Sequence, residues 1–367
     1  MAIVVFLFFV LTVVPIQADI PMIPFISVSS QQFTINCSRI DHAVMSDDLT
    51  TMYACCSFDN YITAVNMSVT PPNVTHYIYA YAPRTPVFLT GHNLYAYTVD
   101  GYVVVRAINH SLLANISGYP HADNMAYDVL TDSLYVAFNG SSVDCINVTG
   151  LSFLRCNSMS TVTGLPGVEQ IIPDLNHRRL FVATPGNNSG AVAVVTLSNT
   201  TTTIKLLQLP SSCVDDTSLA YIDSVDLIYV VCRNPNSLSI LRPDGTLFQS
   251  FSNSSTLPNN NDDLWFDNIN NRLYISGNSF ISSYSLNTSN GYLKQLQNTP
   301  ADPTTRTSLW IPSQQRFYTF PRYNSSPITV GAFIVNSNFN EGLVQKPTLF
   351  YLLMGMLLCM YLSFIIV

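Results

Sequence analysis

A hydrophobic residue, then tyrosine or phenylalanine, then a strand-forming residue recurs along the chain, each time after a polar turn. The seven occurrences are separated by 42, 40, 46, 48, 45 and 44 residues. They are Met52-Tyr53-Ala54, Leu94-Tyr95-Ala96, Leu134-Tyr135-Val136, Leu180-Phe181-Val182, Ile228-Tyr229-Val230, Leu273-Tyr274-Ile275 and Phe317-Tyr318-Thr319. Because short β-type segments recur at a nearly fixed period, we expect each repeat to form the same small sheet.

Turn-forming residues divide each repeat into hairpins. In four repeats a strand-like segment ends at an aspartate just before the triplet, where we expect the carboxylate to accept backbone N–H groups of the turn. These aspartates are Asp128, Asp174, Asp223 and Asp267. Later in two repeats, Asp244-Gly245 and Asn290-Gly291 separate alternating apolar segments, a strong hairpin signal. The pattern predicts four antiparallel strands per repeat, the blade of an all-β propeller.

The two ends of the array complement each other. The seventh repeat has three candidate strands, at 308–311, 316–320 and 328–335, but no evident fourth. The segment 25–36 is strand-like and belongs to no complete repeat. We therefore expect this N-terminal strand to complete the last blade and close a seven-bladed β-propeller. A six-bladed ring with an irregular first repeat is the alternative, because the first two repeats match the pattern least well.

The aspartate-turn-Leu-Tyr-Val pattern and the Asp-Gly hairpins resemble the repeats of NHL, YVTN and YWTD-type β-propellers. The resemblance is clear over residues 123–320 and weak over the first hundred residues. It implies the propeller architecture and does not by itself imply an activity.

Both termini are hydrophobic. Residues 1–14 are apolar apart from Thr12, and Ala18 offers a small residue for signal-peptide cleavage, so 1–18 is interpreted as a secretory signal. We expect the propeller ectodomain to span 19–336, followed by a spacer over 337–348 and a hydrophobic tail over 349–367. The tail fits a glycosylphosphatidylinositol signal with attachment at Asn340, or alternatively within 336–338. A single transmembrane helix is the competing interpretation.

Composition supports an extracellular location. Charged residues make up 10% of the chain and the net charge is −7, which excludes a basic nucleic-acid-binding protein. Asn-x-Ser/Thr sequons are frequent, and glycans on them would replace surface charge as solubilising groups. The expected glycosylation sites are Asn36, Asn66, Asn73, Asn109, Asn115, Asn139, Asn147, Asn187, Asn199, Asn253, Asn287 and Asn324.

The cysteines suggest disulfides. Cys145 and Cys156 flank a turn symmetrically and are expected to pair across two strands of the third repeat. Cys213 and Cys232 are expected to join the start of the fifth repeat to its second strand. Cys37 is expected to pair with Cys55 or Cys56, and we place Cys55 in the expected set. With Cys359 in the tail, one ectodomain cysteine is left over, which permits a disulfide-linked dimer.

Acidic and amide side chains precede the first strand of several repeats, at positions that we expect to meet at one rim of the central channel. Hard oxygen ligands that converge in this way suit calcium. The proposed ligands are Asn124, Glu169, Asp216 and Asp263. The arrangement is similar to that of six-bladed lactonases, which hold a channel metal with Glu, Asn and Asp. Solvated or hydrogen-bonded loop residues are the competing interpretation.

These features favour a cell-surface, N-glycosylated propeller at the plasma membrane that binds an extracellular protein or glycan. We expect the loops of the fifth and sixth repeats, which carry few sequons, to form the contact face. The alternative is a calcium-dependent lactonase or esterase at the channel. A purely structural coat glycoprotein is a third, weaker possibility. No catalytic residue is assigned.

Overall fold

The computed structural model describes residues 24–336 except 158, 175, 187–189, 198–201, 253–255, 297 and 324–325. The predicted signal segment, spacer, tail and lipid-attachment residue Asn340 lie outside the described residues, as do Asn187, Asn199, Asn253 and Asn324. The chain divides into one unit over Phe25–Val335 and a second that contains the two ends. In the second unit, Pro24 and Asn336 are joined by a hydrogen bond from Asn336 N to Pro24 O of 2.8 Å. No helix among the described residues has the length and apolar character of a membrane span.

Seven antiparallel sheets form a ring, so the seven-bladed all-β propeller is confirmed and the six-bladed alternative is wrong. Blade one contains β3 (Ile40–Met45), β4 (Thr51–Cys56), β5 (Tyr61–Asn66) and β6 (Asn73–Tyr79). Blade two contains β7 (Pro86–Leu89), β8 (Leu94–Val99), β9 (Gly101–Ala107) and β10 (Leu112–Tyr119). Blade three contains β11 (Met125–Asp128), β12 (Ser133–Phe138), β13 (Ser142–Asn147) and β14 (Leu154–Arg155). Blade four contains β15 (Ile171–Asp174), β16 (Arg179–Thr184), β17 (Ala191–Thr196) and β18 (Thr203–Gln208). Blade five contains β19 (Asp216–Ile222), β20 (Leu227–Arg233), β21 (Asn236–Leu241) and β22 (Leu247–Phe251). Blade six contains β23 (Leu264–Asp267), β24 (Arg272–Ser276), β25 (Phe280–Leu286), β26 (Leu293–Gln295) and β27 (Thr299–Pro300). Blade seven contains β28 (Thr305–Ile311), β29 (Arg316–Pro321) and β30 (Ile328–Val335), together with β1 (Phe25–Ser27) and β2 (Phe33–Ile35) from the N-terminal segment.

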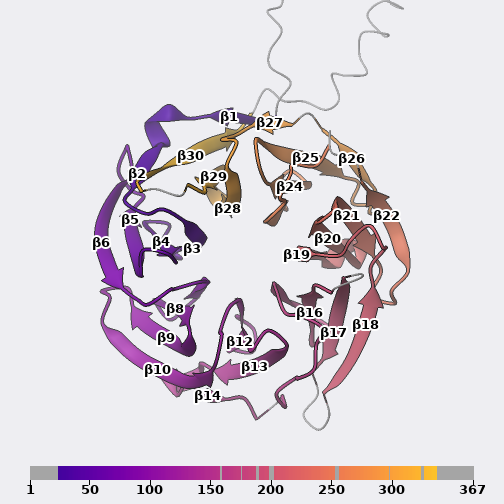
Figure 1. Ribbon diagram of the computed structural model, residues 1–367, viewed down its shortest axis with the longest axis horizontal. Coiled ribbons are helices and arrows are strands. Elements are labelled where there is room, and N and C mark those ends of the chain that lie inside the picture. The colour runs from indigo at the N-terminus through magenta and orange to yellow at the C-terminus, as the bar shows by residue number, and fades with distance from the viewer. Residues whose placement is uncertain are drawn as a thin grey trace, which may run out of the picture. The chain divides into compact units, whose positions relative to one another are not determined.

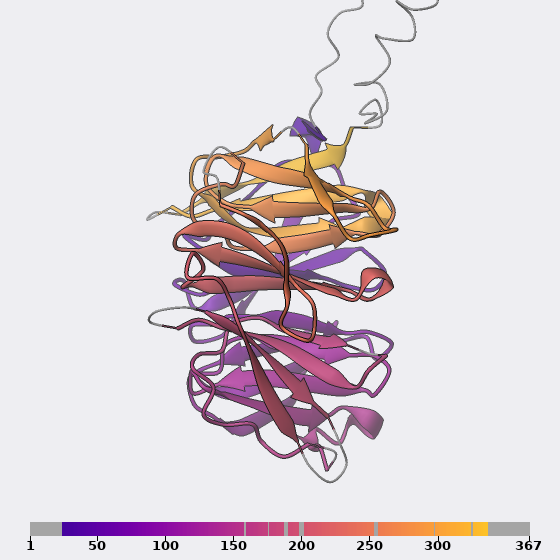
Figure 2. The same ribbon diagram turned by 90° about the vertical axis from the view of Figure 1, so that its right-hand side faces the viewer.

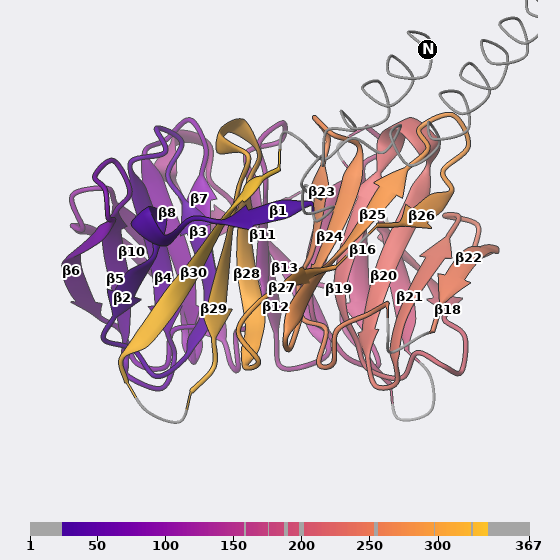
Figure 3. The same cartoon turned by 90° about the horizontal axis from the view of Figure 1, so that it is seen from above.

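The first strand of each blade faces the centre of the ring and the fourth lies at the circumference, as β3 and β6 show (Figure 1). Successive blades stack face to face, which is visible edge-on in Figure 2 and from above in Figure 3. The second strand is therefore covered on both of its faces, and its central tyrosines are buried. Tyr53, Tyr95, Tyr135, Tyr229 and Tyr274 are each at most 3% exposed. This burial explains why the triplet recurs.

The ring is closed by the N-terminal segment, as predicted. β1 pairs antiparallel with β30, with Phe25 opposite Val335, and β2 pairs with the other end of β30, with Ile35 opposite Ile328. β30 thus gains the partner that the seventh repeat lacks. The closure removes an exposed strand edge, which would otherwise be open to pairing with another chain.

Three of the four turn aspartates accept backbone N–H groups of their turns, as predicted. Asp128 Oδ1 accepts the backbone N–H of Leu130 at 2.8 Å, and Asp267 Oδ1 accepts that of Ile269 at 3.0 Å. Asp174 accepts the N–H of His177 at 3.3 Å. For Asp223 the prediction is wrong, because this turn is a 3-10 helix over Asp223–Val225 whose backbone closes it, from Asp226 N to Asp223 O at 3.1 Å.

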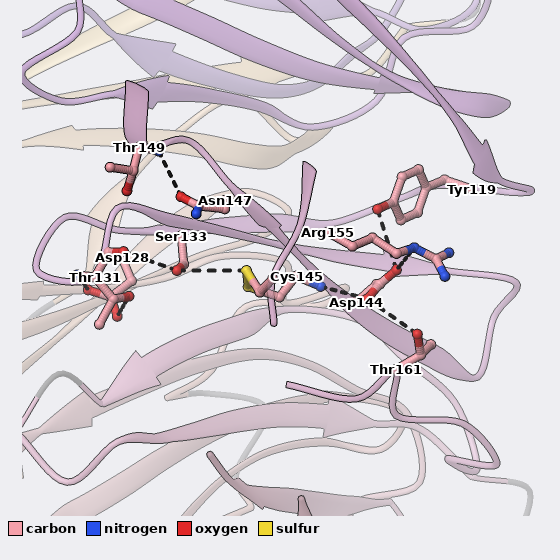
Figure 4. The surroundings of a disulfide bond; sticks show 11 residues. Tyr119, Asp128, Thr131, Ser133, Asp144, Cys145, Asn147, Thr149, Arg155 and Thr161 are labelled. Atoms are coloured by element: carbon pink, nitrogen blue, oxygen red, sulfur yellow. Dashed lines mark hydrogen bonds and ion pairs between the residues drawn. A yellow bond between two sulfur atoms is a disulfide. The ribbon is translucent and has the colours of Figure 1, made fainter. Parts of the chain in front are cut away.

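Three disulfides join the described cysteines. The predicted Cys145–Cys156 and Cys213–Cys232 bonds are present, and Figure 4 shows the surroundings of Cys145, with Asp144 beside it bridged to Arg155 at 2.8 Å. Cys37 pairs with Cys56, so the placement of Cys55 in the disulfide set is wrong. Neighbouring residues of a strand point to opposite faces. Cys56 faces the seventh blade, whereas Cys55 is buried between blades one and two. The leftover thiol among the described cysteines is therefore withdrawn from the surface.

Candidate functional site at the proximal face of the channel

Charged side chains surround the channel at the face of the ring where the first strand of each blade begins, which we call the proximal face. The opposite face, which carries the turns between first and second strands, is the distal face. The channel forms a cavity of about 640 Å³ lined by all seven blades. Its proximal charged residues are Arg39, Asp41, His42, Arg84, Asp123, Glu169, Arg233, Asp262 and Asp263.

β-Bulges interrupt three of the first strands at this face. The register between β3 and β4 shifts between Ile40 and Ala43, so that Asp41 and His42 fall within the bulge. The corresponding shifts in blades five and seven fall at Thr217 and Arg306. Because a bulge changes the direction of the side chain it carries, these strands begin with polar residues outside the regular alternation.

Arginines neutralise much of the acidic rim. Arg39 contacts Asp41 at 2.8 Å, and Arg84 contacts Asp123 at 3.3 Å. Arg233 contacts Asp262 and lies 3.8 Å from Asp215. The rim is therefore a network of alternating charges rather than a purely acidic site.

The predicted calcium ligands do not all meet. Asn124, Glu169 and Asp263 line the channel, with Asn124 Nδ2 donating to Glu169 Oε2 at 3.5 Å. Asp216 lies outside this lining and is fully buried, and its Oδ2 accepts the backbone N–H of Thr184 at 2.8 Å. Since one ligand is withdrawn and arginines occupy neighbouring carboxylates, the residues present do not fit a four-ligand calcium site.

Burial alters the pKa of several carboxyl groups here. It raises the pKa of Asp216 to about 7. Burial and the adjacent Asp123 raise the pKa of Glu169 to about 7, and burial and Asp262 do the same for Asp263. For His42, burial alone would lower the pKa, but Asp41 and other nearby aspartates outweigh it and raise the pKa above its usual value.

These shifts predict that the fold loses stability as the pH rises. A carboxyl whose folded-state pKa is above its unfolded value of 3.8 holds its proton more tightly in the native state, so unfolding becomes easier between about pH 4 and 7. The raised pKa of His42 also lowers the stability as the pH rises. The protonated imidazole stabilises the native state, and this stabilisation is lost as the pH passes the folded-state pKa of His42. We expect a melting temperature several degrees higher at pH 5 than at pH 8, at constant ionic strength. Asp216→Asn, which cannot ionise, should flatten the profile, and a melting temperature that rises toward pH 8 would contradict the argument.

The arginines of the proximal face are the residues that sequence analysis missed. Arg233 is the last residue of β20, the triplet strand of blade five, and Arg322 directly follows β29, the triplet strand of blade seven. Arg306 occupies the bulge at the start of β28. Aligning the ends of the second strands, and not only the starts of the first, would have brought Arg233 and Arg322 to the same face.

A second polar cavity lies on the proximal face between blades five and six. It has a volume of about 510 Å³, and its walls are asparagine side chains together with Asp215 and Arg233. Two of the segments that form it, both in blade six, are joined by a hydrogen bond from Asn278 N to Asn259 O of 2.8 Å. Asn236 Nδ2 of blade five donates to Asn259 Oδ1 at 2.9 Å. Arg233 also lines the channel, so the two cavities adjoin.

One cluster of potential ligands lies elsewhere. Asp174, His177 and Asp223 bring ligand atoms within 4.8 Å of one another at the distal face. Arg179 Nε already donates to Asp174 Oδ2 at 2.6 Å, and Asn176 Nδ2 donates to Asp223 Oδ2 at 2.8 Å. These contacts make the cluster a hydrogen-bonded junction between the distal turns of blades four and five.

The eight described sequon asparagines occur on both faces of the ring and at its circumference. None is buried. Five lie at turns between third and fourth strands, on the distal face: Asn66, Asn73, Asn109, Asn147 and Asn287. Asn115 is on the outer strand β10, whereas Asn36 and Asn139 lie toward the proximal face of blades seven and three. The proximal loops of blades five and six carry no sequon among their described residues, and Asn253, between β22 and β23 in the chain, lies outside the described residues.

Several sequons adopt the same local turn. In Asn109 and Asn287 the side-chain Oδ1 accepts the hydroxyl of the serine two residues later, at 2.8 and 2.7 Å. In Asn147, Oδ1 accepts the backbone N–H of Thr149 at 2.8 Å. This Asx turn uses the amide oxygen and leaves the amide nitrogen, the atom that carries an N-glycan, pointing away from the turn.

Comparison with known proteins supports the fold alone. No family model matches the chain, and no curated protein matches its sequence. Hydrazine synthase of Kuenenia stuttgartiensis matches with a TM-score of 0.65 and 12% identity, over 84% of this chain and 99% of that one. A chain of a mitotic checkpoint complex matches with a TM-score of 0.63 and 10% identity, over 86% of this chain and 94% of that one. The NHL, YVTN or YWTD assignment stays a prediction.

Proposed function

We propose that the protein is a cell-surface, N-glycosylated β-propeller that binds an extracellular protein or glycan through the proximal face of blades five and six. The observation that carries this proposal is the polar cavity at the proximal face of blades five and six, which adjoins the charged channel through Arg233. Binding in propellers generally uses loops presented by the rigid ring.

The location rests on the sequence. The signal over 1–18 and the tail over 349–367 support export and membrane attachment, with Asn340 as the preferred lipid-attachment residue. Three disulfides agree with an oxidising compartment. A disulfide-linked dimer has less support, because the unpaired Cys55 is 0% exposed.

The hydrolase alternative has one observation in its favour. Glu169 faces a polar cavity with a pKa near 7, which suits an acid or base catalyst. Two observations weigh against the metal-dependent form of the hypothesis: Asp216 is withdrawn, and Arg84 and Arg233 compete with a cation for the carboxylates. We therefore place binding ahead of catalysis.

Added glycans test the proposed contact face. Phe280→Thr creates a sequon at Asn278 on the wall of the proximal cavity, and Tyr292→Thr creates one at Asn290 in the distal turn of the same blade. Binding of fluorescent multimers of the full chain to cultured cells and to a glycan array should be abolished by the first glycan and unchanged by the second. Occupancy is checked by the mobility shift after enzymatic deglycosylation.

The same pair of variants can refute the proposal. Equal binding by both glycosylated variants would exclude the proximal cavity as the contact face. Loss of binding with Tyr292→Thr alone would move the contact to the distal face. Absence of saturable binding by the unmodified chain to either surface would overturn the binding function itself.

A further inference from the structure

Two arginines at the proximal face have no counter-ion in the described part of the chain. Arg306 and Arg322 are half-buried, and neither takes part in an ion pair with a described residue. The nearby carboxylates are engaged elsewhere, since Asp41 pairs with Arg39 and Asp262 pairs with Arg233. Half-buried cations are normally paired, because their removal from water is costly.

The fold brings these two residues to neighbouring backbone positions on paired strands. Arg306 occupies the bulge at the start of β28, and Arg322 directly follows β29, the strand paired with β28. The backbone closes at this point, with Thr305 opposite Pro321 and Arg322 N donating to Thr304 O at 3.1 Å. Blade one lies alongside, and Arg39 immediately precedes its first strand.

Neighbouring arginines act on both guanidinium groups. Burial, followed by Arg39 and Arg306, lowers the pKa of Arg322, and Asp262 and Asp41 oppose this effect. Burial also lowers the pKa of Arg306, with Arg233 and Arg39 adding to the effect and Asp262 opposing it. Like charges repel one another, and an anion bound by Arg306 and Arg322 would relieve the repulsion. Guanidinium groups bind carboxylate, sulfate and phosphate oxygens through paired N–H donors.

We propose that Arg306 and Arg322, assisted by Arg39, form an oxyanion-binding site that receives a carboxylate or sulfate group of the ligand. The site lies on the proximal face of blades seven and one, next to blade six, so the inference rests on the proposed function and extends its contact face by specifying a charged group on the partner. It is tested with small anions and therefore does not require the partner to be known. A failure here would leave the binding function standing with an uncharged ligand.

The test compares anions at equal ionic strength. The full chain, purified from a secretory eukaryotic host in non-ionic detergent, is melted in sodium chloride, sodium sulfate and sodium glucuronate. Sulfate stabilises proteins in general through exclusion from their surfaces, an effect that does not saturate at low concentration. Binding instead gives a saturable rise in melting temperature. The two salts also tell a sulfated partner from a carboxylated one.

Substitutions separate the site from other arginines. In Arg306→Gln/Arg322→Gln the saturable rise should disappear, with an affinity about tenfold or more weaker, because charge-assisted hydrogen bonds are lost. Arg84→Gln is the matched control, since it removes a rim arginine that already has Asp123 as its partner. It should retain the response of the unmodified chain.

A second readout distinguishes an anion site from a structural role. Without a binding anion, the double variant should be at least as stable as the unmodified chain, because two mutually repelling cations have been removed. A double variant that melts lower in chloride would indicate that the arginines support the fold, and would overturn the proposal. The proposal also fails if neither anion gives a saturable rise, or if the rise persists in the double variant.

Discussion

Replacing Phe25 by alanine is expected to lower the free energy of unfolding by about 3–5 kcal/mol, the usual cost of removing a fully buried phenylalanine. Phe25 is 0% exposed in the short strand β1, and its ring lies 4.6 Å from that of Tyr274 in blade six and 5.4 Å from that of Phe317 in blade seven. The side chain thus joins the closing strand to two blades at once. Denaturant unfolding followed by tryptophan fluorescence would measure the loss, because Trp310 belongs to the same cluster.

The neighbouring residue provides the control. Ile26 is 40% exposed on the opposite face of β1, so Ile26→Ala should change the stability by no more than about 0.5 kcal/mol. If Phe25→Ala were as mild as Ile26→Ala, the N-terminal strand would not be a structural part of the ring. The result would then argue against closure by β1.

Removing the Cys213–Cys232 disulfide should cost about 3 kcal/mol. The bond closes a loop with a sequence separation of 19 residues, and loops of that size restrict the unfolded chain by about this amount. Both cysteines are 0% exposed, so Cys213→Ala/Cys232→Ala avoids placing a hydroxyl in the core. The measurement is chemical denaturation of the double variant and the unmodified chain, each in oxidising buffer.

Cys55→Ala serves as the comparison for this variant. It removes one small buried thiol and no covalent link, and is expected to cost about 1 kcal/mol. Reducing agent should destabilise the Cys55 variant as much as the unmodified chain, because all three disulfides remain in both. A Cys55 variant as unstable as the double alanine variant would indicate that cavity formation, rather than the cross-link, explains the loss.

The fold could be predicted because its repeating unit has a repeating physical cause. The aromatic residue of each triplet lies on a strand covered on both faces, so burial imposes the same residue type at nearly the same interval. Hairpins at Asp244-Gly245 and Asn290-Gly291 followed from backbone conformation, and both glycines have a positive φ. The last repeat lacks a fourth strand of its own, and this predicted closure because its third strand would otherwise have an exposed edge.

The site was less predictable because it depends on deviations from that regularity. Asp215 and Asp216 are adjacent, as are Asp262 and Asp263, and strand alternation sends neighbouring side chains to opposite sides. In blade five the bulge after Asp216 leaves this carboxylate buried, whereas both aspartates of blade six line the channel. A sequence gives no sign of where the pairing register of two strands shifts by one residue. The choice between Cys55 and Cys56 failed for the same reason, since it required knowing which face of β4 meets blade seven.

Closure by the N-terminal strand also sets an order on the assembly of the ring during synthesis. The partner of β1 and β2 is β30, which ends at Val335, so residues 25–35 must wait until almost the whole propeller has been translated. Six complete blades can form on local contacts before then, since each pairs consecutive strands. Until β30 emerges, the chain carries an unpaired strand at its beginning. The unpaired strand is therefore most accessible to chaperones and to other chains in that interval. In a stalled or truncated chain that lacks β30, the ring would remain unclosed.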